Sequence, residues 1–322
     1  MKRIPAVIVA LALGCAGTVQ AQSQKPVRFL VPYAAGGAVD VYARGVATPM
    51  AKALGQPIVI ENIGGAGGNI AVARVAKSAP DGETFLFHNM AMATNPSLYR
   101  KLEYNPLTDF DYVGVVAHSI MAMVARPDLP VDNLKDFIGY ARKMGDKVTI
   151  GDGGVGGPTN LCALLFMSAI GTRFTIVSYK GGAPALQDVM GRNIDLLCDG
   201  TATTSKVIAA GKVKALGVSS KTRLKSMPDV PTIDEGGLSG FELAPWSAIY
   251  APKGTPRAVL ERMSTSLQTA IADKELIAAF EKLGLVPTTK ELATPAGLQG
   301  HLKAEIEKWG GLLKRAGVQP VD

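Results

Sequence analysis

Short apolar runs alternate with glycine-rich turns and amphipathic stretches along the first part of the chain. Val27–Val31 is an apolar run that predicts a strand, and it ends in the turn-forming residues 32–37, Pro-Tyr-Ala-Ala-Gly-Gly. A helix is predicted over 40–54, because apolar side chains recur there at helical spacing. The same order then repeats, with a strand at 58–60, glycines at 64–68, a helix at 69–77 and a strand at 84–87.

A second copy of this pattern lies further along the chain. Strand-like runs at 147–150 and 174–178 lead through glycines into helix-like stretches at 159–170 and 183–190, and a further strand is predicted at 194–198. Two such strand–helix–strand–helix–strand units predict an α/β protein with two lobes. In both units the glycine-rich loops follow the carboxyl ends of strands, where ligands bind in open α/β sheets.

The last third of the chain is predicted to be helical after one returning strand. The stretch 241–251 is expected to be a strand that rejoins the first lobe. Helices are expected at 257–272, 274–283 and 296–316. The first and third of these follow a Thr-Pro pair, which is typical of helix N-termini.

The N-terminus has the pattern of an export signal. Lys2 and Arg3 precede an apolar stretch over 4–17, and Val-Gln-Ala at 19–21 places small residues where a signal peptidase cleaves. We expect residues 1–21 to be a signal peptide and the mature protein to be secreted. Lipid attachment at Cys15 is the alternative. No other run reaches 18 apolar residues, so no membrane-spanning helix is expected.

The ionisable residues favour neither catalysis nor nucleic-acid binding. The formal net charge is +7, without a block of Lys and Arg. The three histidines form no H-E-x-x-H pair, and no G-x-S-x-G motif is present. Residues 65–70 start as G-x-G but lack the third glycine of a dinucleotide-binding loop. We therefore expect no enzyme activity, no cofactor and no metal site.

Two cysteines, Cys162 and Cys198, remain after removal of the signal peptide. Each has apolar neighbours, and their spacing matches no metal or redox motif. Buried thiols are favoured here over a disulfide, although an oxidising compartment would permit the bond.

The glycine-rich loops are better explained as anion-binding elements. Each leads into a predicted helix, and the free N–H groups and dipole of a helix N-terminus favour a negative charge. Such a site holds a carboxylate without any Arg or Lys. Two lobes that present these loops to each other form a cleft that closes by hinge motion. This arrangement predicts a ligand-binding protein.

Several motifs are similar to those of a known family. Residues 31–40, Val-Pro-Tyr-Ala-Ala-Gly-Gly-Ala-Val-Asp, resemble the opening motif of the Bug (TctC-like) proteins, the extracytoplasmic solute receptors of tripartite tricarboxylate transporters. The resemblance covers essentially the whole mature chain in order. Further matching segments are Glu61-Asn62 with the glycines after it, Ala-Pro-Asp-Gly at 79–82, Asn-Pro-Ser-Leu-Tyr at 95–99, Tyr-Lys-Gly at 179–181, Pro-Asp-Val-Pro-Thr at 228–232, Trp246 and Ala-Pro-Lys-Gly-Thr-Pro at 251–256.

The resemblance implies a type II periplasmic-binding-protein fold, an α/β fold of two lobes with a hinge of two crossovers. One lobe would combine 22–125 with 246–322, and the other would be 126–245. The implied function is capture of a small organic carboxylate by hinge closure in the periplasm. The implied partners are the membrane subunits of a tripartite tricarboxylate transporter, with the receptor acting as a monomer. The alternative is a ligand sensor of the same fold that signals to a membrane partner.

The resemblance also implies which residues contact the ligand. The first lobe would contribute two backbone loops, and the second lobe a glycine loop, the segment near Tyr179, and Asp199. The loop residues implied are Tyr33, Ala34, Ala35, Gly67, Gly68, Asn69, Gly154, Pro158, Thr159 and Asn160.

Some candidate residues have two interpretations. His88, Met90 and Met92 follow a predicted strand end where the family often carries small hydroxyl residues. If the methionines line the cleft, they favour an aromatic or otherwise apolar acid as ligand; the alternative is that they pack inside the lobe. Asp199 either accepts a hydrogen bond from the ligand or, slightly favoured, caps the helix that starts near residue 201. Trp246 either walls the cleft or packs at the hinge.

Overall fold

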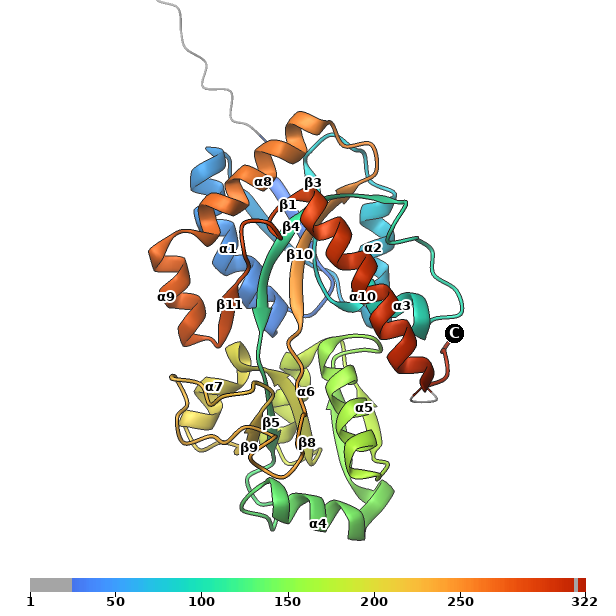
Figure 1. Cartoon of the computed structure of the whole chain (residues 1–322), viewed down its shortest axis with the longest axis vertical. Helices are drawn as coiled ribbons and strands as arrows, with labels where there is room; N and C mark the ends of the chain where they lie inside the picture. Colours follow the sequence, from blue (N-terminus) through green and yellow to red (C-terminus); the bar gives the residue numbers. More distant parts are fainter. Residues whose placement is uncertain (1–24, 316–317) are drawn as a thin grey trace, which may run out of the picture.

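The computed structural model describes residues 25–315 and 318–322, and its chain forms two α/β lobes that stack along the long axis of the molecule (Figure 1). The predicted signal peptide lies outside the described residues. Within the described ranges, no helix combines the length and the apolar character needed to cross a membrane.

The first lobe, called lobe 1, is built from both ends of the described chain. Its strands are β1 (Val27–Val31), β2 (Ile58–Asn62), β3 (Thr84–Asn89), β4 (Phe110–Ser119), β10 (Trp246–Pro252) and β11 (Leu285–Pro287), and its helices are α1 (Ala38–Leu54), α2 (Asn69–Ala76), α3 (Ala91–Leu98), α8 (Arg257–Ile271), α9 (Lys274–Lys282) and α10 (Pro295–Arg315). The strands form one sheet in the order β11-β4-β10-β3-β1-β2. β1 pairs in parallel with β2 and β3, so the loops after these strands meet at one edge of the sheet.

The second lobe, called lobe 2, is built from the middle of the chain. Its strands are β5 (Met121–Ala125), β6 (Thr149–Asp152), β7 (Thr175–Ser178), β8 (Leu196–Gly200) and β9 (Lys214–Val218), and its helices are α4 (Leu134–Met144), α5 (Pro158–Ile170), α6 (Gly182–Met190) and α7 (Thr201–Ala209). The sheet order is β7-β6-β8-β5-β9. β6 is parallel to β7 and β8, which brings the loops after β6, β7 and β8 to the edge that faces lobe 1 (Figure 1).

The chain crosses between the lobes twice, as the resemblance implies. The first crossing differs from the expected boundary after residue 125. Ile120 separates β4 from β5, and β5 pairs with β8 and β9, so residues 121–125 belong to the sheet of lobe 2. The second crossing ends at Pro245, directly before β10. The difference arises because the apolar run over 112–125 contains no turn signal to mark where the extended chain leaves one sheet for the other.

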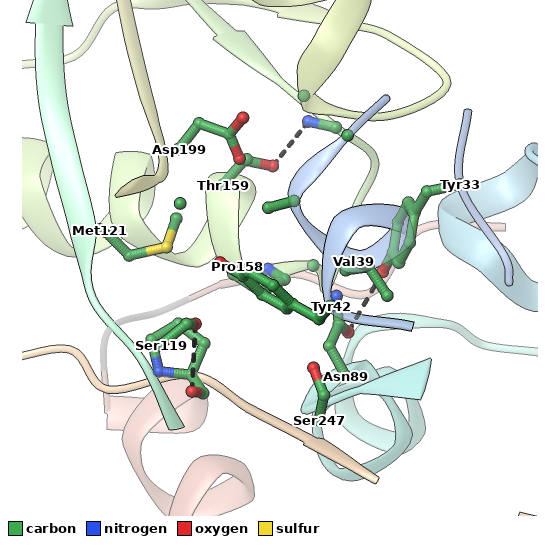
Figure 2. Close-up of a pocket in the computed structure, with 17 residues that line it drawn as sticks. Tyr33, Val39, Tyr42, Asn89, Ser119, Met121, Pro158, Thr159, Asp199 and Ser247 are labelled. Carbon is green, nitrogen blue, oxygen red and sulfur yellow. Dashed lines mark hydrogen bonds between the residues drawn. The ribbon is translucent and has the colours of Figure 1, made fainter. Parts of the chain in front are cut away.

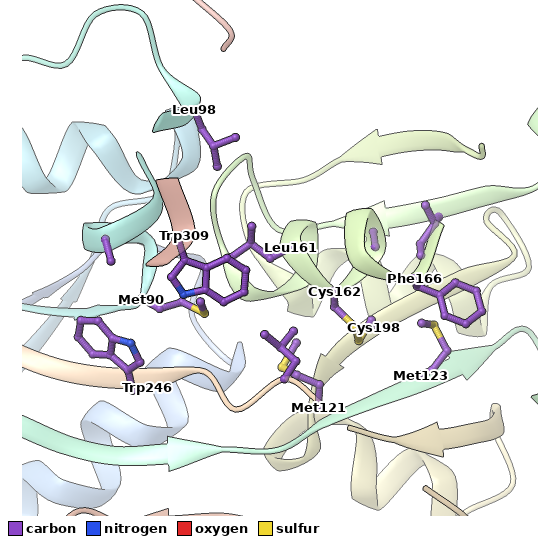
Figure 3. Close-up of a cluster of buried hydrophobic side chains, with 14 of the residues drawn as sticks. Met90, Leu98, Met121, Met123, Leu161, Cys162, Phe166, Cys198, Trp246 and Trp309 are labelled. Atoms are coloured by element: carbon purple, nitrogen blue, oxygen red, sulfur yellow. A yellow bond between two sulfur atoms is a disulfide. The ribbon is translucent and has the colours of Figure 1, made fainter. Parts of the chain in front are cut away.

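A disulfide joins two elements of lobe 2, which contradicts the expectation of buried thiols. Cys162 in α5 and Cys198 in β8 are bonded, and their Cα atoms lie 6.1 Å apart, within the usual range for a disulfide. Both side chains are fully buried. Figure 3 shows the bond inside an apolar cluster that also contains Leu161 and Trp309. The bond therefore ties α5 to the strand that it covers.

Candidate functional site

Loops of the two lobes touch one another, so the cleft between them is closed. The amide of Ala34, after β1, donates a hydrogen bond of 2.9 Å to the carbonyl of Lys180, after β7. The hydroxyl of Thr94 in α3 donates to the carbonyl of Gly156, before α5, over 2.7 Å. Each bond joins lobe 1 to lobe 2.

One close contact between the lobes involves two glycine-rich loops. Gly67 and Gly154 both have positive φ angles, +62° and +117°, which favour glycine. A Cβ atom on Gly154 would lie only 2.9 Å from the Cα atom of Gly67. Glycine at these positions therefore allows the two backbones to meet when the cleft is closed.

Behind these loops lies a small cavity with walls from both lobes (Figure 2). Its volume is about 40 Å³, enough for about three water molecules. Its lining residues are Tyr33, Gly37, Ala38, Val39, Tyr42, Asn89, Ser119, Met121, Gly153, Gly157, Pro158, Thr159, Gly182, Asp199, Gly200, Pro245 and Ser247.

In the described part of the chain, four helices begin at the wall of this cavity. α1 belongs to lobe 1, and α5, α6 and α7 belong to lobe 2. Their N-cap residues are Gly37, Gly157, Gly181 and Gly200, and none provides a side-chain capping bond. The first N–H groups of a helix have no partner within the helix, and its N-terminus carries a partial positive charge. These N-termini make the cavity wall attractive to an anion.

Among the described residues that line the cavity, one side chain carries a formal charge, and it is Asp199. Asp199 is 4% exposed, and the hydroxyl of Thr203 donates to its Oδ2 atom over 2.7 Å. Burial raises the pKa of Asp199 to about 6, against the hydrogen bonds from Thr203 and the Gly200 amide, which lower it. No Lys or Arg among the described residues lines the cavity, so any anion there relies on backbone and hydroxyl groups.

Four of the predicted ligand contacts line the cavity: Tyr33, Pro158, Thr159 and Asp199. The hydroxyl of Tyr33 donates to Asn89 Oδ1 over 3.2 Å, which fixes its ring at the wall.

Asp199 is not the helix cap that was slightly favoured from the sequence. Gly200 is the N-cap residue of α7, and no side chain makes its capping bond. The Asp199 carboxylate instead binds the hydroxyl of Thr203, one turn into the helix. The favoured interpretation is therefore corrected, and the carboxylate stands at the cavity wall.

The remaining predicted residues of the first-lobe loops lie outside the cavity lining. The Ala34 amide is already bonded to lobe 2, and Ala35 is exposed. Gly67 and Gly68, together with Gly154 and Tyr179 of lobe 2, line a separate outer crevice.

Two polar residues predicted to bind the ligand have local partners instead. Asn69 Oδ1 accepts hydrogen bonds of 2.7 Å from Asn95 and from Tyr104. Tyr179 donates its hydroxyl to Asp188 over 2.6 Å. Neither side chain lines the cavity.

The glycine loop before α5 uses its own amides internally. The amide of Gly154 donates to Asp152, and the amide of Gly156 donates to the side chain of Asn160. The Asn160 side chain also donates to Asp152 over 2.7 Å. These bonds hold the loop in shape, so Asn160 supports the site from behind and does not line the cavity.

His88, Met90 and Met92 are fully buried and lie outside the cavity lining. The His88 ring packs near Tyr33, with ring centroids 5.7 Å apart, and burial lowers its pKa to about 3, so the ring is neutral. Both methionines belong to the apolar core, which agrees with the alternative that they pack inside the lobe; Figure 3 shows Met90 there. Because the methionines do not line the cavity, they give no support for an aromatic ligand.

Trp246 packs at the hinge and not at the cavity wall. It is 2% exposed, and its indole N–H donates to Glu305 in α10 over 3.1 Å. Its ring also packs against His301, with centroids 4.7 Å apart. The contacts fix the start of β10 against the C-terminal helix.

Sequence reasoning missed several residues that line the cavity. Ser119, Pro245 and Ser247 lie on or beside the two crossovers. Ser119 was missed because the first crossover was expected after residue 125 and not at Ile120. Tyr42 was counted only as part of the apolar face of a helix, but it stands one turn after Gly37 and faces the cavity (Figure 2). Glycines one to three residues before the predicted helices of the two repeated units were the available signal for Gly37, Gly157 and Gly182.

Comparison with known proteins agrees with this architecture. The family model described as "Tripartite tricarboxylate transporter family receptor" matches residues 42–318. A UPF0065 protein from the TAR-I ttuE-ttuC' intergenic region of Agrobacterium vitis is 44% identical over 91% of this chain and 84% of its own length.

Solved structures are similar over nearly the whole described chain. The periplasmic binding protein BugD is 39% identical and covers 92% of this chain and 99% of its own, with a TM-score of 0.89. A protein from R. palustris with adipate is 32% identical and covers 93% of this chain and 100% of its own, with a TM-score of 0.87. MatC from Rhodopseudomonas palustris, with bound malate, is 32% identical and covers 89% of this chain and 98% of its own, with a TM-score of 0.85. The chain therefore belongs to the Bug/TctC family of periplasmic solute-binding receptors and has their two-lobed fold.

Proposed function

We propose that this protein captures a small organic carboxylate in the cavity between its lobes and presents it, in the closed form, to the membrane subunits of a tripartite tricarboxylate transporter. The observation that carries the proposal is the set of helix N-termini, one from lobe 1 and three from lobe 2, at a cavity without Lys or Arg. The predicted signal peptide and the periplasmic relatives support capture in the periplasm.

The electrostatics of the cavity favour a carboxylate over a neutral solute. Each helix N-terminus carries about half a positive charge, and an anion there is stabilised by about 0.3–1 kcal/mol per helix, or up to about 2 kcal/mol when partly buried. Because the helices come from both lobes, an anion that contacts α1 and α5 together stabilises the closed form. Binding and closure are then one event, and closure is the signal that the membrane partner detects.

Two structural neighbours support the ligand class. One is a structure with bound malate and the other a structure with adipate, and both ligands are small carboxylic acids. The family description supports the transporter as partner.

The experiment is thermal unfolding of the mature, ligand-stripped protein against mono-, di- and tricarboxylates of two to six carbons. An acid at about 100 times its Kd adds about 2.7 kcal/mol of stability, which gives a readable rise in Tm. Ser247→Leu, which fills the cavity wall, should abolish the shift. The control Ser168→Leu, at an exposed position of α5, should keep it. A folded protein that responds to no acid in the panel would show that the proposed function is wrong.

A further inference from the structure

Asp199 sits at an unusual place for a carboxylate. It is the second-to-last residue of β8, at the cavity wall and directly against the N-terminus of α6: a Cβ atom on Gly182 would lie 2.6 Å from its Cγ atom. Within the described ranges, no Lys, Arg or His forms a salt bridge with it. The Thr203 hydroxyl and the Gly200 amide supply hydrogen bonds, but neither neutralises the charge.

Lobe 1 places a second polar group beside this carboxylate. The hydroxyl of Tyr42 is buried and lacks a partner of good hydrogen-bond geometry among the described residues. The neighbouring Ser119 hydroxyl donates instead to the carbonyl of Pro245 over 3.2 Å. Tyr42 reaches across the cleft, because a Cβ atom on Gly200 would lie 2.5 Å from its oxygen. The Ser119 side chain is also a hydrogen-bonding neighbour of Tyr42. Because a tyrosine hydroxyl can both donate and accept, Tyr42 retains hydrogen-bonding capacity for a ligand.

These two groups make different demands on a ligand. An ionised Asp199 accepts hydrogen bonds and donates none, whereas Tyr42 can do both. A plain carboxylate held by the helix N-termini would leave Asp199 facing a second anion or an apolar chain. Two buried carboxylates at one site disfavour each other's charge, and a buried carboxylate beside apolar atoms keeps its desolvation penalty. A hydroxyl or ammonium group on the ligand removes both problems.

We infer that Asp199 determines ligand specificity: it selects carboxylates that also carry a hydrogen-bond donor, a hydroxyl or an ammonium group, over the plain acid of the same length. Tyr42 completes the site from lobe 1 by bonding the same part of the ligand once the cleft is closed. The inference rests on the proposed function, because it names the ligand class of that same cavity.

The test is calorimetric titration of the mature, ligand-stripped protein at pH 7.5 with matched acids. One series is propionate, lactate and alanine; the other is succinate, malate and aspartate. Within each series only the donor group changes, so ligand length is constant. The hydroxyl or amino member of at least one series should bind at least tenfold more tightly than its plain acid. The comparison of lactate with alanine, and of malate with aspartate, identifies which donor the site prefers.

Asp199→Asn removes the negative charge and keeps the side chain's shape. This variant should lower the preference for the donor-bearing acid at least fivefold. The control Asp188→Asn removes another carboxylate of lobe 2, one that binds Tyr179 and lies outside the cavity lining, and should leave the preference unchanged.

The outcomes separate the inference from the function on which it rests. If a plain acid binds as tightly as its hydroxyl and amino analogues, and Asp199→Asn leaves the ratios unchanged, the role of Asp199 is refuted while the carboxylate function stands. If no acid of either series binds the folded protein, the proposed function fails and this inference fails with it.

Discussion

Gly182→Ala tests how closely the cavity wall is packed. Gly182 is the first residue of α6, and a methyl group there would lie 2.6 Å from Cγ and 2.7 Å from Oδ1 of Asp199. Both atoms belong to a buried carboxylate at the end of a central strand. Either α6 or Asp199 must therefore move to admit the methyl group.

The expected loss of stability follows from the contacts that this movement disturbs. Overpacking a filled site costs about 1–3 kcal/mol. Loss of the hydrogen bond from Thr203 to the Asp199 carboxylate adds about 1.5–3 kcal/mol if the bond breaks completely. Alanine recovers about 0.5–1 kcal/mol, because glycine loses more backbone freedom on folding. We expect a net loss of about 2–5 kcal/mol if that bond breaks and, because the wall moves, at least tenfold weaker ligand binding.

The assay is urea unfolding followed by circular dichroism, with Gly139→Ala as the matched control. Gly139 lies within α4 of the same lobe, and a Cβ atom there would meet nothing within 4 Å. The control should gain up to about 1 kcal/mol from helix propensity. If Gly182→Ala is as stable as the control and binds ligand normally, the described packing of Asp199 against α6 is incorrect.

Three further predictions follow from the buried groups. Burial raises the pKa of Asp199 from 3.8 to about 6, so the folded state binds this proton more tightly than the unfolded state, and the contribution of Asp199 to stability falls as pH rises from about 4 to 6. Asp199→Asn should therefore stabilise the ligand-free protein by about 2–3 kcal/mol at pH 7 and by little at pH 4 in urea unfolding; equal effects at both pH values would contradict the assignment. Removal of the disulfide by Cys162→Ala with Cys198→Ala opens a loop of 36 residues and should lower the free energy of unfolding by about 4 kcal/mol, whereas an unchanged midpoint would mean that the bond adds nothing. Thr94→Val removes the hydrogen bond to Gly156 between the lobes and should speed ligand dissociation about 3- to 10-fold in stopped-flow measurements. A dissociation rate equal to that of the unmodified protein would contradict this role of the bond.

Local patterns in the sequence were sufficient to predict most of the elements. The helix expected over 159–170 is observed at Pro158–Ile170, and the strand expected at 27–31 has those bounds in the structure. The repeated strand, glycine loop and helix also predicted two α/β lobes. Such features depend on side-chain periodicity and on turn residues within about 15 positions, and both can be read directly from the sequence.

The closed cleft depends on contacts between residues far apart in the sequence. The resemblance implied that Gly67 and Gly154 hold the ligand. In the structure the two loops meet each other, and the cavity lies behind them. The pattern of a loop shows that backbone groups are accessible, but it does not show whether a ligand or the opposite lobe will occupy that space.

The sequence by itself therefore determined the family, the two-lobed architecture and the type of site, a cluster of helix N-termini after strands. Only the tertiary structure decided that Tyr42 and Asp199 share one cavity, and that Cys162 meets Cys198. The reason is physical. Periodicity and turn chemistry act between near neighbours in the chain, whereas the partner of a buried polar or sulfur atom depends on how two lobes and their sheets pack in space.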